Sequence, residues 1–401
     1  MFSLRSRGFA LFLAALAVRI LVGWRLGHFS NPTMWEPEWI AQNILSGKGF
    51  VIEHLGIDYR AYLLPLYPVF CAIVYALTGK SQVALLLLTC LISAGACLQV
   101  RAIGKRLFPD TAIAQTAGWL TALHPGLIYY ASLLHPLTLD GVTYLWVTWG
   151  WMCLFEKPTT RLALWIGLGS GLALLSRGTI VIFLFFASAL FLWKGPLSKR
   201  KALSLLATAA ITAAIAVSPW LIRNTVVFHR FPLFITSGSQ SLWEGNNPLS
   251  NGTAHLANGS QIIHSLTPKM RQELARRDEL GQSDLFKEEA WRFIRSKPAA
   301  ALQLLWRKWI GFWWFAPNAG LYYPSAYLQA YRWYYTTILT ASLWALWQLR
   351  RRWTELPLLL LVGFALSVGL FQSLHYVEGR HRWTVEPVLL LFAAAAPRRL
   401  R

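Results

Sequence analysis

Two glutamates, Glu36 and Glu38, lie in the polar stretch 31–50 of a 401-residue chain that has only 17 acidic residues. A positioned carboxylate can take the proton of an attacking hydroxyl, which contributes about 10²–10⁴-fold to a rate. Residues 35–46 are predicted to form a helix that ends at Gly47. At about 100° per residue the two side chains point about 200° apart, so a regular helix presents only one of them to a given site.

Two further turns concentrate side chains that can act as acids, bases or anion ligands. In the first, His135 precedes Pro136, which can begin a helix, and Asp140 lies about one turn into that helix. Each of these two residues is either a catalytic or acceptor-positioning group or an ordinary polar group at an interface. The second turn contains more charged and histidine side chains than a simple connector needs. It carries His375, Glu378, Arg380, His381, Arg382 and Glu386 within twelve positions.

The longest polar segment, 223–331, contains a stretch rich in Gly, Ser and Asn. The indole of Trp243 and the amides of Asn246 and Asn247 suit sugar rings and hydroxyls, and His375 is a further candidate for that role; an ordinary polar loop is the alternative. Two amphipathic helices are predicted next, at 268–281 and 283–296, and they would form a small cap. A tryptophan-rich element, 301–315, is predicted to lie at a membrane interface.

The rest of the chain is typical of a membrane protein. Hydrophobic residues make up 55% of it and charged residues only 14%, and apolar runs of about 18 residues predict transmembrane helices. About ten such segments occur, of which 162–175 and 179–193 are short and meet at a polar break around Arg177. The predicted spans are 9–27, 82–100, 111–133, 137–155, 162–175, 179–193, 203–222, 334–349, 356–371 and 385–396.

Lysine and arginine predict the orientation of these spans, because short cytoplasmic loops carry an excess of both. With ten alternating spans the basic clusters fall on one side, both termini are cytoplasmic, and the polar stretches above face outward. The apolar segment 62–77 is therefore predicted to lie at the outer interface. The net charge of +21 reflects this topology and the needs of a lipid phosphate, and it does not indicate nucleic acid. The basic clusters are Arg5/Arg7, Arg101/Lys105/Arg106, Lys157/Arg161, Lys194/Lys199/Arg200/Lys201, Arg350/Arg351/Arg352 and Arg398/Arg399/Arg401.

Two features of the apolar segments bear on function. The first span is predicted to stay as an anchor, and Arg19 at its middle is expected to face other helices or a polar cavity. The four cysteines lie in apolar segments with no CxxC spacing and no histidine at ligand spacing, which predicts neither a disulfide framework nor a metal site.

Six stretches, in order, resemble the GT-C glycosyltransferases of the protein-mannosyltransferase and aminoarabinose-transferase type, which use polyprenyl-phosphate sugars. They are EPEWIAQNILSGKGF, RAYLLPLYPVFCAIVYALTG, GKRLFPDTAIAQTAGWLTALHPGLIYYASLL, GLALLSRGTIVIFLF, SPWLIRNTVVFHRFPLFITSGSQSLWEGNNPLSNGT and EGRHRWTVEPVLLL. The resemblance implies an all-α polytopic membrane protein of GT-C fold. It also implies inverting sugar transfer on the outer face of the cytoplasmic membrane, from a lipid-linked donor to a glycan, lipid or protein acceptor.

The resemblance also implies roles for single residues. The catalytic acid of the relatives is usually an aspartate three or four residues before a tyrosine. Trp39 occupies the tyrosine position here, which makes Glu36 the best match and Glu38 the alternative. A departing phosphate needs positive charge rather than a proton. The candidates are Arg60, Arg177, Arg223, Lys308, Arg380 and Arg382, and Arg380, Arg382 and Arg60 are favoured among them.

Three parts of the chain are expected: a transmembrane module at 1–222 with a first outer loop at 30–80, an outer cap with interfacial helices at 223–330, and C-terminal helices at 331–401. The absence of an Asp-rich motif predicts that no divalent ion is required. Two other functions share much of this pattern. One is a polysaccharide ligase or polymerase with a diphosphate-linked donor, and the other is a transporter or flippase of lipid-linked sugars.

Overall fold

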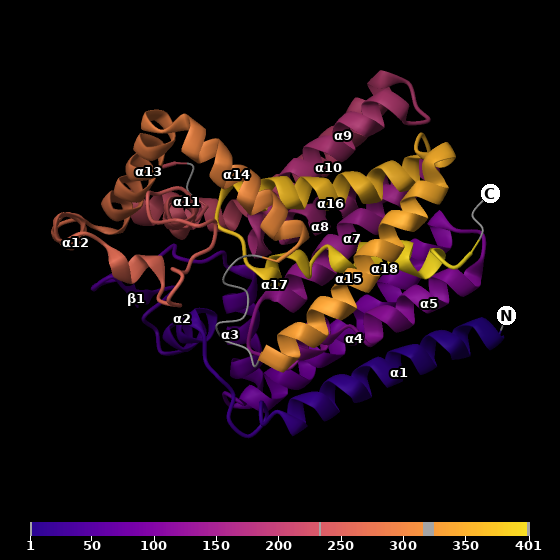
Figure 1. Cartoon of the computed structure of the whole chain (residues 1–401), viewed down its shortest axis with the longest axis horizontal. Coiled ribbons are helices and arrows are strands. Elements are labelled where there is room, and N and C mark those ends of the chain that lie inside the picture. The colour runs from indigo at the N-terminus through magenta and orange to yellow at the C-terminus, as the bar shows by residue number, and fades with distance from the viewer. Residues whose placement is uncertain (1, 232–233, 316–324, 399–401) are drawn as a thin grey trace.

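Apolar helices run side by side through most of the molecule, and a polar cap closes one end of them (Figure 1). The computed structural model describes residues 2–231, 234–315 and 325–398, so Arg399 and Arg401 of the last basic cluster lie outside the described residues. Both ends of the chain lie at the end of the bundle opposite the cap, as the predicted orientation requires.

The ten predicted spans coincide with helices, with one break. The segment 111–133 divides into α5 (Thr111–Ala122) and α6 (Pro125–Ala131), because His124 caps α6 by accepting from Leu127 N and Pro125 follows it. The remaining bundle helices are α1 (Phe2–Arg25), α4 (Gln82–Leu107), α7 (Leu137–Glu156), α8 (Thr160–Ser176), α9 (Val181–Lys194), α10 (Lys199–Phe228), α15 (Ser325–Gln348), α16 (Leu356–Leu374) and α18 (Glu386–Ala395).

Four of the described helices are long and apolar enough to cross a membrane on length and composition alone: Ser6–Arg25, Gln82–Leu107, Lys199–Phe228 and Leu356–Leu374. The helices α8, α9 and α18 are apolar but shorter. The predicted polar break at Arg177 is present, since α8 ends at Ser176 and the short helix η1 (Gly178–Ile180) leads into α9.

Small residues and one buried arginine explain the close packing of the bundle. A Cβ on Gly167 would lie 2.4 Å from Ala209 O, and one on Gly171 would lie 2.6 Å from Ala216 Cβ, so glycine lets α8 approach α10. Arg19 is fully buried, as expected, and donates to Ser93 Oγ on α4 at 2.8 Å and to Ala122 O on α5 at 3.1 Å.

The first outer loop contains a structure that the sequence analysis missed. After α2 (Glu36–Leu45), β1 (Ile52–His54) and β2 (Ile57–Tyr59) form a two-stranded antiparallel hairpin in which Ile52 pairs with Tyr59. Leu55 and Gly56 have positive φ at its turn. These six strand residues are a local exception among the described residues, most of which are helical. The apolar segment 62–77 forms α3 (Leu66–Thr78), which packs against α2.

The cap has a small apolar core of its own. It comprises α11 (Ser237–Gly245), η2 (Ile262–Ser265), α12 (Pro268–Ala275) and α13 (Glu279–Ser296), and Trp243, Ile263 and Phe286 lie in its core. The predicted helix 268–281 ends early, at Ala275. Asp278 accepts from Gly281 N at 2.9 Å and so caps α13, which begins four residues before the predicted start.

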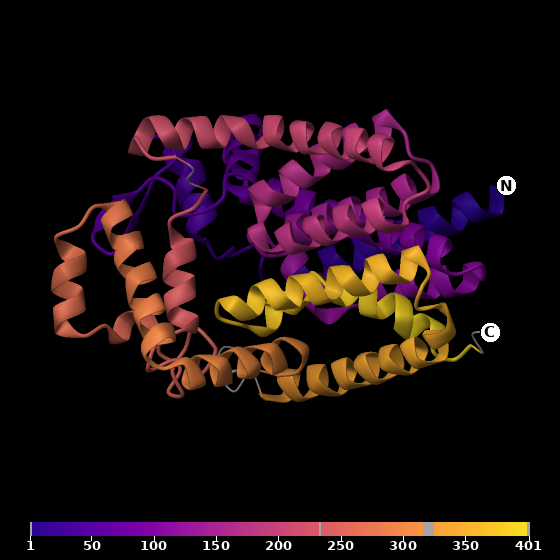
Figure 2. The same ribbon diagram turned by 90° about the horizontal axis from the view of Figure 1, so that it is seen from above.

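The tryptophan-rich helix α14 (Pro298–Trp313) leads from the cap back along the bundle. Seen from above, α14 and α15 lie along one side of the molecule, α10 lies along the opposite side, and α11 to α13 stand together at one end (Figure 2). The short helices η3 (Leu349–Arg352) and α17 (Gly379–Arg382) precede α16 and α18. The last outer turn, 375–385, thereby comes against the cap and the first outer loop.

Candidate active site

The N-terminus of α2 presents its two glutamates to different surroundings, as the helical geometry predicted. Trp35 is the N-cap and Pro37 occupies the first turn. Glu36 is exposed and makes no hydrogen bond or ion pair with any described residue, whereas Glu38 is fully buried. A base must be accessible to its substrate, so the geometry favours Glu36 for that role.

Glu38 joins α2 to α3. Tyr75 OH donates to Glu38 Oε1, and Glu38 Oε2 is buried without a hydrogen-bond partner among the described residues. Burial raises the pKa of Glu38 to about 7, against the opposing effect of the Tyr75 hydrogen bond. A buried carboxyl that holds its proton near neutral pH is suited to joining two helices.

The surroundings of Glu36 come from the hairpin and from the start of α3. Burial lowers the pKa of His54, and the negative charge of Glu36 opposes that shift; burial also raises the pKa of Tyr62, and Glu36 and Glu244 increase that shift. The carboxylate therefore lies within electrostatic reach of both rings.

A chain of hydrogen bonds links this region to the cap. His54 Nε2 lies 2.9 Å from Gln240 Oε1, and Gln240 Nε2 donates to Glu244 Oε1 at 2.9 Å. Burial, together with the charge of Glu378, raises the pKa of Glu244 to about 7, against the opposing effect of the Gln240 hydrogen bond. The first outer loop, α11 and the last outer turn therefore meet at one place.

Arg177 enters the same region from the break between α8 and α9. Its Nε donates to Asp140 Oδ2 at 2.7 Å, and Ser176 Oγ donates to Asp140 Oδ1 at 2.5 Å. Asp140 is fully buried, whereas the Arg177 side chain keeps 26% of its surface exposed. Asp140 is thus placed to orient Arg177 rather than to meet a substrate.

The last outer turn supplies a second arginine. Arg380 pairs with Glu378, and the two side chains are 32% and 15% exposed. His381 forms a capping box with Glu378 at the start of α17. Burial and the charges of Arg380 and Arg177 hold the pKa of His381 well below its usual range, so this histidine is neutral.

His135 lies beside these arginines. Its Nδ1 accepts from Leu137 N at 3.2 Å, so the neutral ring carries its proton on Nε2, where it can donate. Burial, Arg380 and Arg177 lower its pKa well below the usual value. Its ring contacts Trp35 and Tyr130, with centroids 6.0 and 4.8 Å away. Tyr376 lies within electrostatic reach of Glu378, Glu244, Arg380 and Arg177. We refer to the group that meets here as the outer polar cluster: Glu36, His54, Tyr62, His135, Arg177, Gln240, Glu244, Tyr376, Glu378, Arg380 and His381.

Three of the predicted phosphate ligands are engaged in structural contacts. Arg382 is fully buried, where its Nε donates to Glu386 Oε1 at 2.7 Å and its guanidinium lies 3.6 Å from the Tyr335 ring centroid. Glu386 also contacts His124 and Tyr331. This buried network fixes α18 against α5 and α15 and presents no free guanidinium edge to a ligand.

Lys308 and Arg223 are held by carbonyl groups. Lys308 is 1% exposed and donates to Asn246 Oδ1 at 2.9 Å and to Gly245 O at 3.1 Å, and burial lowers its pKa to about 7. Arg223 donates to Arg60 O at 2.6 Å and to Phe50 O at 3.2 Å. Both side chains therefore fix the outer segments to the bundle. The side chain of Arg60, whose carbonyl accepts from Arg223, is exposed.

The predicted sugar-binding side chains also serve the fold. Trp243 is 6% exposed in the cap core, 5.3 Å from the Phe286 ring. Asn246 donates to Leu374 O at 2.9 Å, and Asn247 donates to Trp243 O at 2.8 Å. His375 stacks on Phe371, with ring centroids 5.2 Å apart. Trp243, Asn246 and Asn247 are thus engaged in contacts within the fold, and His375 is half-buried with Phe371 as its ring partner.

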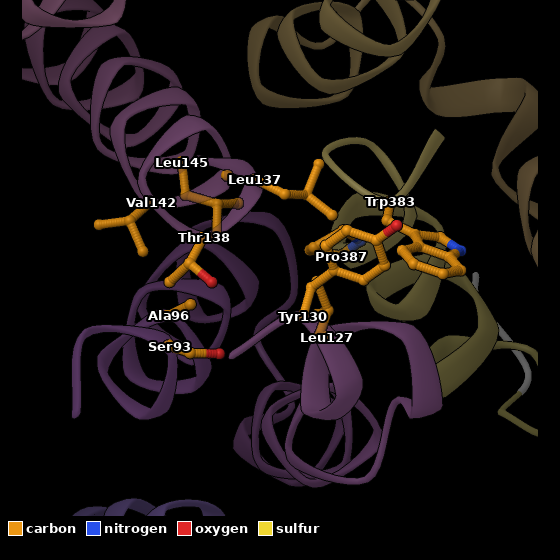
Figure 3. A pocket seen from close by; sticks show the side chains of 11 residues that line it. Ser93, Ala96, Leu127, Tyr130, Leu137, Thr138, Val142, Leu145, Trp383 and Pro387 are labelled. Atoms are coloured by element: carbon orange, nitrogen blue, oxygen red, sulfur yellow. The ribbon is translucent and has the colours of Figure 1, made fainter. Parts of the chain in front are cut away.

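An apolar cleft lies next to His135 on the bundle side. Its lining comes from α4, α6, α7 and the segment 383–387, and the rings of Tyr130 and Trp383 pack edge to face on one side of it, with centroids 5.0 Å apart (Figure 3). Its volume of about 20 Å³ admits about one water molecule.

Several members of the cluster were not assigned from the sequence. Glu378 and His381 stand in the dense last turn, which was recognised without a role for either residue. His54, Tyr62, Gln240, Glu244 and Tyr376 carry no local signal, because they become neighbours only through the fold. Among the described residues, no group of three or more His, Cys, Asp or Glu side chains is placed to hold a metal ion.

Residues 64–222, about two fifths of the chain, match the family model described as dolichyl-phosphate-mannose-protein mannosyltransferase. A search of curated protein sequences finds no match. Among solved structures, the chain is similar to the Archaeoglobus fulgidus oligosaccharyltransferase, crystallised with Zn and sulfate. The TM-score is 0.54 at 15% identity, over 97% of this chain and 48% of the other. The chain thus spans about half the length of that enzyme.

ArnT from Cupriavidus metallidurans also aligns over 97% of this chain. The form bound to undecaprenyl phosphate gives a TM-score of 0.46 at 13% identity and 78% coverage of its own chain, and the apo form gives 0.44, 14% and 76%. The fold similarity to the oligosaccharyltransferase and the match to the mannosyltransferase family model confirm the GT-C fold and the resemblance to membrane glycosyltransferases that the sequence predicted.

Proposed function

We propose that this chain of GT-C fold is an inverting glycosyltransferase that moves a sugar from a polyprenyl-phosphate donor to an acceptor hydroxyl on the outer face of the membrane. The observation that carries the proposal is the outer polar cluster. In it, an exposed carboxylate without a partner among the described residues, Glu36, shares one region with two partly exposed arginines, Arg177 and Arg380.

The cluster has the groups that such a reaction requires. Glu36 takes the proton of the acceptor hydroxyl as its oxygen attacks the anomeric carbon. The bond from that carbon to the phosphate oxygen breaks on the opposite side, which inverts the configuration. The polyprenyl phosphate leaves with the bonding electron pair, and Arg177 and Arg380 stabilise its charge.

Ion pairs hold both arginines in place before the substrate arrives. Asp140 holds Arg177, and Glu378 holds Arg380. Because fixed charges need no reorganisation during the reaction, they stabilise a developing charge better than mobile ones. The neutral His135 can donate from Nε2, and Arg60, whose side chain is exposed at the end of β2, completes the basic side of the proposed site.

A single reconstitution experiment distinguishes the proposed function from its alternatives. The purified chain is placed in liposomes with a polyprenyl-phosphate sugar. The experiment measures the polyprenyl phosphate that is released and the leaflet in which the lipid-linked sugar lies. Release of polyprenyl phosphate with sugar on an acceptor supports the transferase. Translocation without release would establish a flippase, and turnover of diphosphate-linked donors alone would establish a polysaccharide ligase or polymerase.

The donor sugar and the acceptor follow from a cellular measurement. Mass spectrometry of lipids and surface glycans from a deletion strain would identify the donor that accumulates and the product that disappears. The cap is the proposed acceptor-selecting part, because Gln240 and Glu244 of α11 reach the cluster directly. An intact glycan and lipid profile in that strain would contradict the proposal.

A further inference from the structure

A polar recess of about 210 Å³ is lined by the N-terminal part of α1, the C-terminal part of α4 and the first three turns of α5. These parts of the three helices lie at the end of the bundle opposite the cap (Figure 1). The lining residues are Arg7, Arg101, Thr111, Ala112, Gln115, Thr116 and Trp119.

The charge of this recess is positive. Arg7 and Arg101 line it, and the Arg101 guanidinium is oriented by a 2.7 Å hydrogen bond from its Nε to Gln115 Oε1. Asp110, the N-cap of α5, already accepts from Ala112 N at 2.8 Å and lies 3.6 Å from Arg398. Thr111 and Thr116 add hydroxyl groups. This combination suits a phosphate with one or two negative charges.

The α5 face that lines the recess changes in polarity along the helix. Ala112 and Gln115 are followed, at helical spacing, by Trp119 and then by Leu123, which are 37% and 57% exposed. An indole commonly lies at headgroup depth with apolar residues below it. The lining therefore changes from basic through aromatic to apolar along the helix. A phospholipid changes in the same order, from its phosphate through its glycerol to its acyl chains.

We propose that this recess, formed by Arg7, Arg101, Gln115 and Trp119, binds the phosphate headgroup of an anionic phospholipid at the bilayer face opposite the outer polar cluster. The inference does not depend on the proposed transferase activity. A free phosphate would use the arginines but not the exposed apolar residues beyond them, so the two sources of phosphate are separable by experiment.

The test uses the full-length purified chain in detergent and native mass spectrometry of lipid retention. Dioleoyl phosphatidylglycerol is compared with dioleoyl phosphatidylcholine, and glycerol phosphate serves as a headgroup without acyl chains. We expect the wild type to retain phosphatidylglycerol preferentially. Arg7→Gln should lower that retention about fivefold, the effect of one basic residue at a membrane surface. Retention of phosphatidylcholine should be unchanged.

Matched variants make the outcome decisive. Arg7→Lys keeps the charge and should restore retention. Arg161→Gln removes one exposed arginine from the start of α8, away from the recess, and should behave as wild type. Equal losses in Arg7→Gln and Arg161→Gln would overturn the proposal. Displacement of the lipid by equimolar glycerol phosphate would show a phosphate site without lipid selectivity and would overturn it as well.

Discussion

At the scale of single residues, burial separates the two glutamates of α2. Glu36 is exposed and has no partner among the described residues, whereas Glu38 is fully buried against Tyr75. A carboxylate in water can meet an acceptor, whereas a buried one must first lose its contacts. The sequence placed both residues near the site, but only the packing of α2 on α3 distinguishes them.

Glu38 makes stability depend on pH. Its folded pKa of about 7 lies above the ordinary value of 4.5, so the folded state is stabilised where the carboxyl is protonated and loses that contribution as pH rises through 7. The loss is at most about 3 kcal/mol. Between pH 5 and pH 8 the unfolding temperature of the wild type in detergent should fall more than that of Glu38→Gln. Parallel curves for the two proteins would refute the assignment.

Asp140 and Arg177 should act as one unit. Arg177→Gln removes a proposed phosphate ligand and should lower the transfer rate about 10²-fold. Asp140→Asn leaves the guanidinium without its orienting carboxylate and should cost about tenfold. The double variant should be no slower than Arg177→Gln alone, because the carboxylate acts only through the arginine. Single-turnover rates measure this cycle, and multiplicative losses would show that Asp140 has a separate role.

At the scale of elements, the end of α11 is fitted tightly against the last outer turn. A Cβ on Gly245 would lie 2.4 Å from both His375 C and His375 O, whereas one on Gly238, in the same helix, would meet only Ile235 Cγ2 at 3.4 Å. Lys308 donates to the carbonyl of Gly245. The junction of cap, bundle and last turn thus depends on a glycine at one position.

Gly245→Ala should therefore displace the last outer turn and destabilise the protein by about 1–3 kcal/mol, the usual cost of overpacking. Its unfolding temperature should fall and its transfer rate should decrease, because Glu378 and Arg380 follow His375 in the chain. Gly238→Ala is the matched control and should leave both properties unchanged. Similar unfolding temperatures for the two variants would contradict the close fit.

The helices were largely predictable because apolar runs of sufficient length leave few alternatives in a membrane. The hairpin at β1 and β2 was not, because three-residue strands give no periodic signal. The break at His124 depends on a side-chain cap, and the early start of α13 depends on Asp278. At these positions, hydrogen bonds from side-chain caps compete with continuation of the helix. Composition and hydropathy do not predict which of the two prevails.

The candidate site was predictable to the level of segments. The first outer loop, the turn at His135, the break at Arg177 and the last outer turn do meet. The roles within each segment were harder to assign, because residues of one type divide between ligand and scaffold. Arg380 lies in the outer polar cluster, whereas Arg382, two residues later, is completely buried against Glu386.

At the scale of the whole molecule, the positions of the termini and of the cap give a test of topology. The four native cysteines are buried, so maleimide labelling of an introduced exposed cysteine should stand out from the labelling of the native ones. Lys269→Cys, exposed in the cap, should react with a membrane-impermeant maleimide on intact cells. Arg161→Cys, exposed at the start of α8, should react only after the membrane is opened. The reverse pattern would invert the proposed orientation.

In the proposed mechanism, all parts of the molecule position groups around one carboxylate. The bundle positions Arg177, the cap and last turn position Glu244 and Arg380, and α2 presents Glu36 among them. The central claim is that Glu36 takes the proton of the acceptor, and the two glutamates of α2 offer a matched pair of substitutions. Both variants exchange a carboxylate for an amide of the same size.

The decisive measurement is the rate of polyprenyl phosphate release by Glu36→Gln and Glu38→Gln in liposomes at pH 7, with the fold of each checked by its unfolding temperature. Glu36→Gln should be slower than wild type by about 10²–10⁴-fold and should unfold at the wild-type temperature, because its side chain makes no contact that the substitution removes. Glu38→Gln should keep most of the activity. Wild-type release by Glu36→Gln, together with loss of release by a folded Glu38→Gln, would contradict the account.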